Sequence, residues 1–164
     1  MDKIFQRLFA NNFSELPGLN VEALIPVPES LVNEIMAVTL RGSKNITSCQ
    51  MSIHRDNRIV ADVRSPLLPW TLHMKMKLFH SADFTGPPKL RAFLENNLLL
   101  GKLGSLLRVL PKGVALYSNQ VALDIEAFTP AEHKQLLALV KSVDIQTEEG
   151  KVILKVKLEK QSEL

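Results

Sequence analysis

Histidine and cysteine are the side chains best suited to catalysis or metal binding, and the chain contains four His and one Cys. His54 and Asp56 fall in a predicted turn, where Asp is favoured for backbone reasons. Cys49 falls in a strand pattern and has no neighbour typical of a nucleophile. None of these positions shows the H-E-x-x-H or C-x-x-C spacing of a metal site. We therefore predict no metal, no cofactor and no catalytic residue. An enzyme of unassigned chemistry is the third interpretation.

Lysine side chains form a second group that could bind a partner. We expect five of them to project from the exposed face of a sheet, where Lys also blocks edge-to-edge aggregation: Lys75, Lys77, Lys151, Lys155 and Lys157. Nucleic-acid binding by such a face requires stacking aromatics, and Phe79 is the one candidate on that side, which argues against nucleic acid. Anionic lipid head groups require only the charge, and the net charge of +3 permits that contact.

The most apolar stretch of the chain runs from residue 87 to residue 111. Pro87 and Pro88 favour the start of a helix, in which Leu90, Phe93 and Leu94 lie on one stripe. Gly101 and Gly104 predict a break or kink in the helix near Gly101. Lys102 and Arg108 interrupt the apolar run, which is also too short for a membrane span. Two interpretations stay open: a pair of core helices, or a segment whose surplus leucines line a pocket or contact a membrane.

The composition predicts a single domain. With 164 residues, 46% of them hydrophobic and 23% charged, the chain is long enough to bury one sizeable core. We divide it into an N-terminal helix and extended link (residues 1–27), an α+β core (28–158) and a frayed tail (159–164). The first residues lack the pattern of a secretory signal, so we expect a cytoplasmic protein.

Two helices are predicted in the first 40 residues. The first begins after Asp2, and the link that follows is bracketed by Pro26 and Pro28. The second runs from Pro28 through Leu40, and Gly42 supplies the left-handed position past its end. Its predicted buried face consists of Leu31, Ile35 and Val38, joined by Val32 and Met36.

From Ile46 the apolar period changes from 3.6 to 2, which predicts strands. A hairpin with the three-residue loop 55–57, and Asn57 at positive φ, pairs Ile53 with Ile59 and Met51 with Ala61. Trp70 to Leu78 is the cleanest strand, with one apolar and one polar face.

The C-terminal half predicts two further hairpins and one helix. The first hairpin turns at Ser118-Asn119 and places Leu116 opposite Val121. Thr129 to Glu132 form a capping box before a helix with the apolar run Leu136, Leu137, Leu139 and Val140. The second hairpin turns at Glu149-Gly150 and places Asp144 opposite Lys155 and Glu148 opposite Lys151. Together these elements predict an α+β fold: a mainly antiparallel, curved sheet of about seven strands with helices packed on one face.

A family resemblance rests on the Leu-rich helix and on two paired segments, VALYSNQVALDIEAF (114–128) and GKVILKVKLEK (150–160). In element order and alternation over residues 28–158 the chain resembles one half-module of the tubular lipid-binding (TULIP) proteins. The resemblance implies a sheet wrapped around a helix and a hydrophobic groove for acyl chains. The missing export signal and the Gly-interrupted helix depart from that family.

These observations favour a non-enzymatic protein that binds a lipid or other apolar ligand, or a membrane surface, in a groove between the Leu-rich segment and the sheet. The predicted ligand-binding residues are Trp70, Met74, Met76, Leu98, Leu99, Leu103, Leu106, Leu107 and Leu110. Lys102 and Arg108 are the predicted head-group contacts. The alternative is a scaffold protein whose apolar surface is buried in a homodimer or a partner complex.

Overall fold

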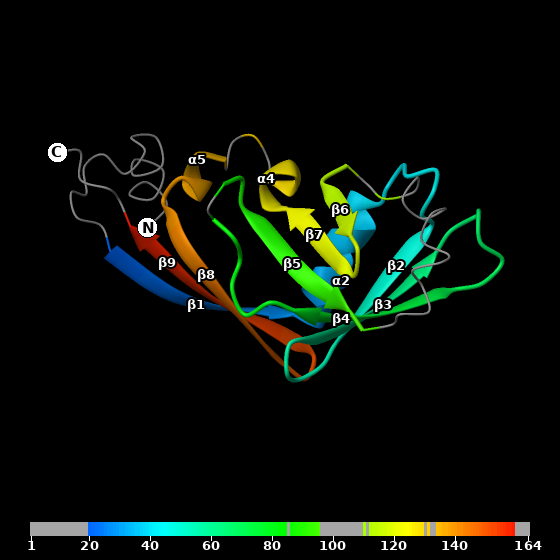
Figure 1. Ribbon diagram of the computed structural model, residues 1–164, viewed down its shortest axis with the longest axis horizontal. Helices are drawn as coiled ribbons and strands as arrows, with labels where there is room; N and C mark the ends of the chain where they lie inside the picture. Colours follow the sequence, from blue (N-terminus) through cyan, green and yellow to red (C-terminus); the bar gives the residue numbers. More distant parts are fainter. Residues whose placement is uncertain are drawn as a thin grey trace.

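The computed structural model describes residues 20–84, 86–95, 110, 112–129, 131 and 134–159, and these residues form two antiparallel sheets (Figure 1). The three-stranded sheet has the order β1-β9-β8 and consists of β1 (Asn20–Pro28), β8 (Val140–Glu148) and β9 (Lys151–Glu159). The six-stranded sheet has the order β2-β3-β4-β5-β7-β6 and consists of β2 (Ser48–Ile53), β3 (Arg58–Arg64), β4 (Leu72–Leu78), β5 (Lys89–Leu94), β6 (Val114–Tyr117) and β7 (Gln120–Asp124). The helices in this part of the chain are α2 (Glu29–Thr39), α4 (Ile125–Phe128) and α5 (Lys134–Leu137).

The predicted α+β, mainly antiparallel fold class is confirmed. The predicted hairpin registers are confirmed as well, because Ile53 pairs with Ile59 and Leu116 pairs with Val121. In the turn between β2 and β3, Asp56 and Asn57 adopt φ values of 59° and 60°. Asn favours this left-handed region because its short polar side chain can bond locally.

The prediction of a helix that starts at Pro87 is wrong, because residues 89–94 form strand β5. Leu90, Ala92 and Leu94 face the core, whereas Phe93 faces outward, so the segment alternates with period two. β5 lies between β4 and β7 and pairs with both. Residues 96–109, where the rest of the Leu-rich helix was predicted, lie outside the described residues, as does the predicted N-terminal helix.

The predicted extended link before α2 is strand β1. It pairs along its whole length with β9, from Asn20 opposite Glu159 to Pro28 opposite Lys151. Pro26 and Pro28 are compatible with this role because β1 is an edge strand, where a missing N–H need not break a ladder bond. With β1 and β5 included, the described strands number nine, two more than predicted.

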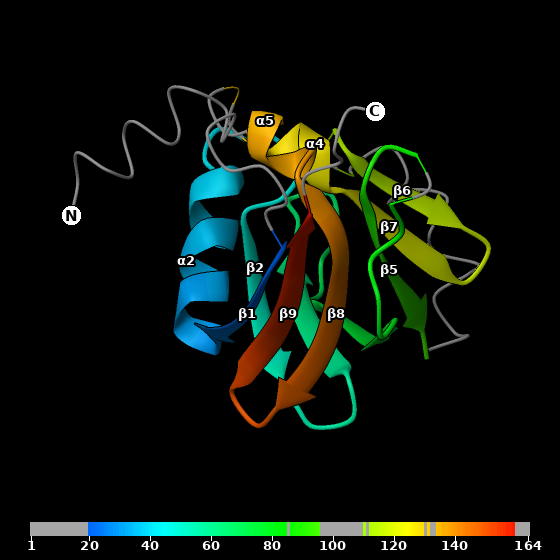
Figure 2. The ribbon, with the colours of Figure 1, turned by 90° about the vertical axis from the view of Figure 1, so that its left-hand side faces the viewer.

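Helix α2 covers the edge of β2, and this contact decides which face of the helix is buried (Figure 2). Asn33 Nδ2 donates to the Met51 carbonyl at 2.9 Å, and Asn33 Oδ1 accepts from the Met51 N–H at 2.6 Å. One turn earlier, Glu29 Oε2 accepts from the Ile53 N–H at 2.7 Å. The side chains of α2 thus take the place of a neighbouring strand.

This orientation corrects the predicted face of α2. Val32 and Met36 pack against the core, as expected, but the other three predicted core residues are exposed: Leu31, Ile35 and Val38. The reason is that Glu29 and Asn33 must face β2 to bond its backbone, which turns the neighbouring stripe outward. Gly42 follows the helix with φ 81°, as predicted.

The two sheets meet where the chain leaves β4. Residues 80–83 lie against β8: the Ile145 N–H donates to the His80 carbonyl at 2.6 Å, and the Ala82 N–H donates to the Val143 carbonyl at 2.9 Å. Ile145 from one sheet and Ile53 from the other are the largest fully buried side chains among the described residues. The core therefore lies between the inner faces of the two sheets.

The C-terminal helix is shorter than predicted, and Val140 belongs to β8 instead. Pro130 and Glu132 of the predicted capping box lie outside the described residues. The unpredicted helical turn α4 is capped by Asp124, whose side chain accepts from the N–H groups of Glu126 and Ala127. In the last hairpin the predicted pairing of Glu148 with Lys151 is confirmed, with an ion pair of 2.7 Å. Asp144 lies opposite Lys155 as predicted, but the Lys155 ammonium contacts Glu22 of β1 at 2.9 Å.

Candidate functional site

The structure places the predicted sheet residues in different surroundings. Met76 is buried in the core, and Met74 packs against the same core cluster. Trp70 precedes β4 and is 50% exposed, so it does not share the burial of the two methionines. Leu110 is half-buried. The remaining predicted site residues lie outside the described part of the chain: Leu98, Leu99, Lys102, Leu103, Leu106, Leu107 and Arg108.

Trp70 belongs to an exposed apolar loop that joins β3 to β4, and we call residues 64–71 the tip. Leu67 is 63% exposed and Leu68 packs against the core, so the two leucines point in different directions. The turn is fixed locally, because Ser65 Oγ accepts from the Leu67 N–H at 3.2 Å and the Ser65 carbonyl accepts from the Leu68 N–H at 3.1 Å. In Figure 1 the tip is the loop at the far right of the molecule.

Two prolines restrict the backbone of this loop. Pro66 and Pro69 flank the Leu67-Leu68 pair, and a proline fixes φ near −65°. A restricted loop loses little conformational entropy when its exposed side chains bind a partner. Leu67 is therefore held outward before any contact is made.

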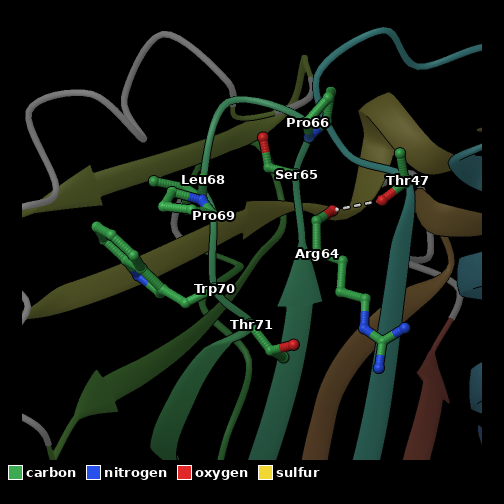
Figure 3. A pocket seen from close by; sticks show the side chains of 8 residues that line it. All are labelled: Thr47, Arg64, Ser65, Pro66, Leu68, Pro69, Trp70 and Thr71. Carbon is green, nitrogen blue, oxygen red and sulfur yellow. Dashed lines mark hydrogen bonds between the residues drawn. The ribbon is translucent and has the colours of Figure 1, made fainter.

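A surface pocket of about 340 Å³ lies at the base of the tip (Figure 3). In Figure 3 the Trp70 ring lies on one side of it, the Arg64 side chain lies on the other, and Thr71 lies between them. Thr47, at the start of β2, closes the Arg64 side, because its N–H and its hydroxyl donate to the Arg64 carbonyl at 2.8 and 3.1 Å. The pocket thus combines an aromatic surface, hydroxyl groups and one cation.

Exposed cations lie in the tip and in the loop that leads to Thr47, a residue that lines the pocket at the base of the tip. Arg64 is exposed at the end of β3, and Arg41 and Lys44 are exposed in the loop that leads from α2 to Thr47. Among the described residues, no carboxylate forms an ion pair with these three side chains. Arg64 therefore brings positive charge to the pocket that the exposed Trp70 also lines.

The three histidines that the structure describes each lie within hydrogen-bond distance of another side chain away from the tip. His54 Nδ1 lies 3.0 Å from Glu149 Oε1, and His73 Nδ1 lies 2.6 Å from Asp62 Oδ1. His80 Nδ1 lies 3.1 Å from Asn57 Nδ2. Within the described ranges, no group of three His, Cys, Asp or Glu side chains could hold a metal ion.

Cys49 is half-buried beside α2. Burial, and to a smaller extent the Asp62 carboxylate, together raise the pKa of its thiol to about 11. A thiol with such a pKa is a poor nucleophile at neutral pH, because the thiolate is the reactive form.

The strand pattern predicts Trp70 as a site residue, but it does not point to Leu67 or Arg64. The available signal was the placement of two leucines between prolines, directly before a tryptophan: SPLLPW at residues 65–70. A turn with these residues exposes apolar side chains that a folding chain would otherwise bury.

None of the described helices combines the length and the apolar character needed to cross a membrane. Comparisons with protein-family models, with curated proteins and with solved structures gave no match to this chain.

Proposed function

We propose that this domain binds the surface of an anionic membrane, without catalysis, through the tip. The single observation that carries the proposal is the exposure of Leu67 and Trp70 beside Arg64. Trp is favoured at the boundary between head groups and acyl chains, because its ring is amphipathic. Leu67 would enter the acyl region, whereas Arg41, Lys44 and Arg64 would contact anionic head groups.

The magnitudes favour reversible binding. Full burial of one Leu side chain is worth about 1.5 to 3 kcal/mol. Each basic residue near an anionic membrane surface adds about 1 kcal/mol. Neither term alone gives stable attachment, but a few apolar side chains together with three cations give measurable binding to anionic vesicles. The proposal therefore predicts dependence on both the apolar residues and the lipid charge.

The groove predicted from the sequence is a separate proposal. Apart from Leu110, its helical wall consists of residues outside the described part of the chain, and the resemblance to the TULIP proteins also stays a prediction. Trp70 belongs to both proposals. A groove for acyl chains beside the tip would let the domain take a lipid from the membrane that it contacts.

Trp70 provides the experiment, because it is the only Trp in the sequence. Its fluorescence would be recorded with vesicles of phosphatidylcholine alone and with vesicles that contain phosphatidylglycerol. We expect a blue shift with the anionic vesicles, and quenching by lipids brominated along the acyl chain. Co-sedimentation with the same vesicles gives the affinity independently.

Leu67→Ser is the diagnostic variant, and Leu24→Ser is its matched control, because Leu24 on β1 is 67% exposed and lies away from the tip. We expect Leu67→Ser to weaken vesicle binding about tenfold or more, whereas Leu24→Ser binds like the unmodified protein. Arg64→Gln should weaken binding to anionic vesicles only, with Arg55→Gln in the β2–β3 turn as control. Equal loss in both leucine variants, or no binding to either vesicle type, would contradict the proposal.

Helix α2 supports a second candidate function, association between two copies. Leu31, Ile35 and Val38 form an exposed apolar stripe on this helix. Light scattering tests this candidate: a dimer that Ile35→Glu converts to a monomer would support it. A protein that stays monomeric at all accessible concentrations would exclude association of two copies through α2.

A further inference from the structure

The outer face of the six-stranded sheet carries an unbroken row of cationic, aromatic and amide side chains. The strand registers align one residue from each of five neighbouring strands, from β3 to β6: Arg58, Lys77, Phe93, Gln120 and Tyr117. Adjacent strands lie about 4.8 Å apart, so the row extends over about 19 Å. All five side chains lie on the same face, because each is paired directly with the next.

Two aromatic rings in this row are open to solvent. Phe93 is 40% exposed and Tyr117 is 59% exposed. Phe79, beside the row, packs on Phe93 with ring centroids 4.6 Å apart and an angle of 36° between the rings. Aromatic rings on the open face of a sheet form a flat platform, on which another planar ring can stack.

The charge around these rings is positive. Lys75 and Lys77 project from β4, beside Phe93. Arg58 is paired with Glu95 at 3.5 Å, and Arg91 is paired with Asp83 at 2.6 Å. Among the residues that the structure describes, no acidic side chain pairs with either lysine. The row therefore offers two stacking surfaces and two cations for a negatively charged partner.

We propose that this face binds single-stranded nucleic acid. Bases would stack on Phe93 and Tyr117, Gln120 would lie between them, and Lys75 and Lys77 would contact phosphates. Aromatic side chains on a sheet face stack two or three bases in this way, and the contact requires bases that are not paired. A membrane is a poorer fit, because the rings lie within a flat sheet and do not protrude as the tip does.

The structure also removes the sequence argument against nucleic acid. That argument rested on Phe79 as the one candidate aromatic. Phe79 is the one candidate only if residues 89–94 form a helix. Because these residues form strand β5, Phe93 lies next to Phe79. Tyr117 joins the row through its pairing with Gln120.

The test is fluorescence anisotropy with labelled oligo(U) and oligo(dT) of about 12 nucleotides, and with a DNA duplex of the same length. We expect both single strands to bind more tightly than the duplex, with affinity that falls as salt rises. Phe93→Ala and Tyr117→Ala should each weaken binding at least about fivefold. Lys77→Gln should weaken it and reduce the salt slope by about one.

Two variants serve as controls. Trp70→Ala removes an exposed aromatic from the tip, and Lys157→Gln removes a cation from the other sheet, so both should bind oligonucleotides normally. Tyr117 is on an edge strand, so its variant remains informative if Phe93→Ala is destabilised. Preference for duplex, or loss in Lys77→Gln without loss in either aromatic variant, would overturn the proposal. It would also fail if Phe93→Ala and Tyr117→Ala abolished vesicle binding and left oligonucleotide binding intact.

Discussion

Asn57 and Thr147 exchange two hydrogen bonds across the boundary between the two sheets. The Asn57 N–H donates to Thr147 Oγ1 at 2.7 Å, and the Thr147 N–H donates to Asn57 Oδ1 at 2.9 Å. Asn57 Nδ2 also donates to the Ile145 carbonyl at 3.0 Å, and Asn57 is only 2% exposed. A turn residue of one hairpin thus completes the hydrogen bonding of β8 in the other sheet.

Asn57→Ala should therefore be strongly destabilising. A buried group that loses its partner costs about 1 to 3 kcal/mol, and this change affects both the Thr147 N–H and the Ile145 carbonyl. We expect a loss of about 3 kcal/mol in the free energy of unfolding, measured with urea. Asp56→Ala is the control, because Asp56 has nearly the same φ but is exposed. Its cost should be limited to about 1 kcal/mol of backbone strain. Equal losses would show that the buried bonds contribute little.

Asn33→Leu should expose the edge of β2. The change removes both hydrogen bonds to Met51, and the unpaired backbone groups of an edge strand can then pair with another chain. We expect a loss of about 2 kcal/mol in stability and an increased tendency to aggregate. Urea unfolding and the rate of increase in light scattering on mild heating measure the two effects. Glu34→Leu on the exposed side of α2 is the control and should leave stability nearly unchanged.

Among the four glycines that the structure describes, Gly113 should be the one at which substitution by Ala is most harmful. A Cβ at this position would lie 2.7 Å from the Ala127 Cβ and 3.0 Å from the Phe128 ring, and Gly113 has φ 94°. Gly42 has a similar φ of 81° but open space around it, so Gly42→Ala isolates the backbone cost. We expect about 1 kcal/mol for Gly42→Ala and clearly more for Gly113→Ala, because α4 must move. Thermal unfolding of both variants tests this difference.

Cys49 should react slowly in the folded protein. Its folded-state pKa of about 11 lies above the ordinary value of 9.0, so the neutral thiol dominates at pH 8. Since the thiolate fraction falls tenfold for each pKa unit, alkylation by iodoacetamide should be about 100-fold slower than in the urea-unfolded chain. Asp62→Asn removes the second cause of the raised pKa and should speed alkylation modestly. Rapid alkylation of the folded protein would contradict the assigned pKa.

Local patterns were sufficient to predict the hairpins. The register of Ile53 with Ile59 follows from the strand alternation together with one turn residue that tolerates positive φ, and all of that information lies within a few residues. Leu116 opposite Val121 follows in the same way. The pairing of Glu148 with Lys151 needed only the complementary charges and the Gly150 turn.

The errors came from contacts with distant segments. Leu90, Phe93 and Leu94 fit a helical stripe, but Leu90, Ala92 and Leu94 fit a strand equally well, and a short apolar run cannot distinguish them. The segment is a strand because it pairs with β4 on one side and with β7 on the other. In α2, an apolar stripe faces outward because Asn33 bonds the backbone of Met51. Met51 lies 18 positions further along the chain, so the local pattern of the helix could not reveal this contact.

The candidate site was predictable only in part. Trp70 was identified from its strand pattern, but its role changed, because the cleanest strand begins at Leu72 and leaves Trp70 in the tip. The outer row of the six-stranded sheet can be predicted only when four strand registers are known together. Because residues 89–94 were predicted as a helix, the row could not be recognised. Phe93 and Tyr117 fall in the same row only after β5 is recognised.

The pairing of β1 with β9 has a consequence for synthesis of the chain. Among the described strands, the first, β1, pairs with β9 (Lys151–Glu159) alone, so it has no partner until this last strand is made. During translation, Leu24 and Ile25 therefore stay in an unpaired segment while residues 29–150 are made. We expect the three-stranded sheet to form only after residues 151–159 have left the ribosome, and early chaperone contact to concentrate on the unpaired β1.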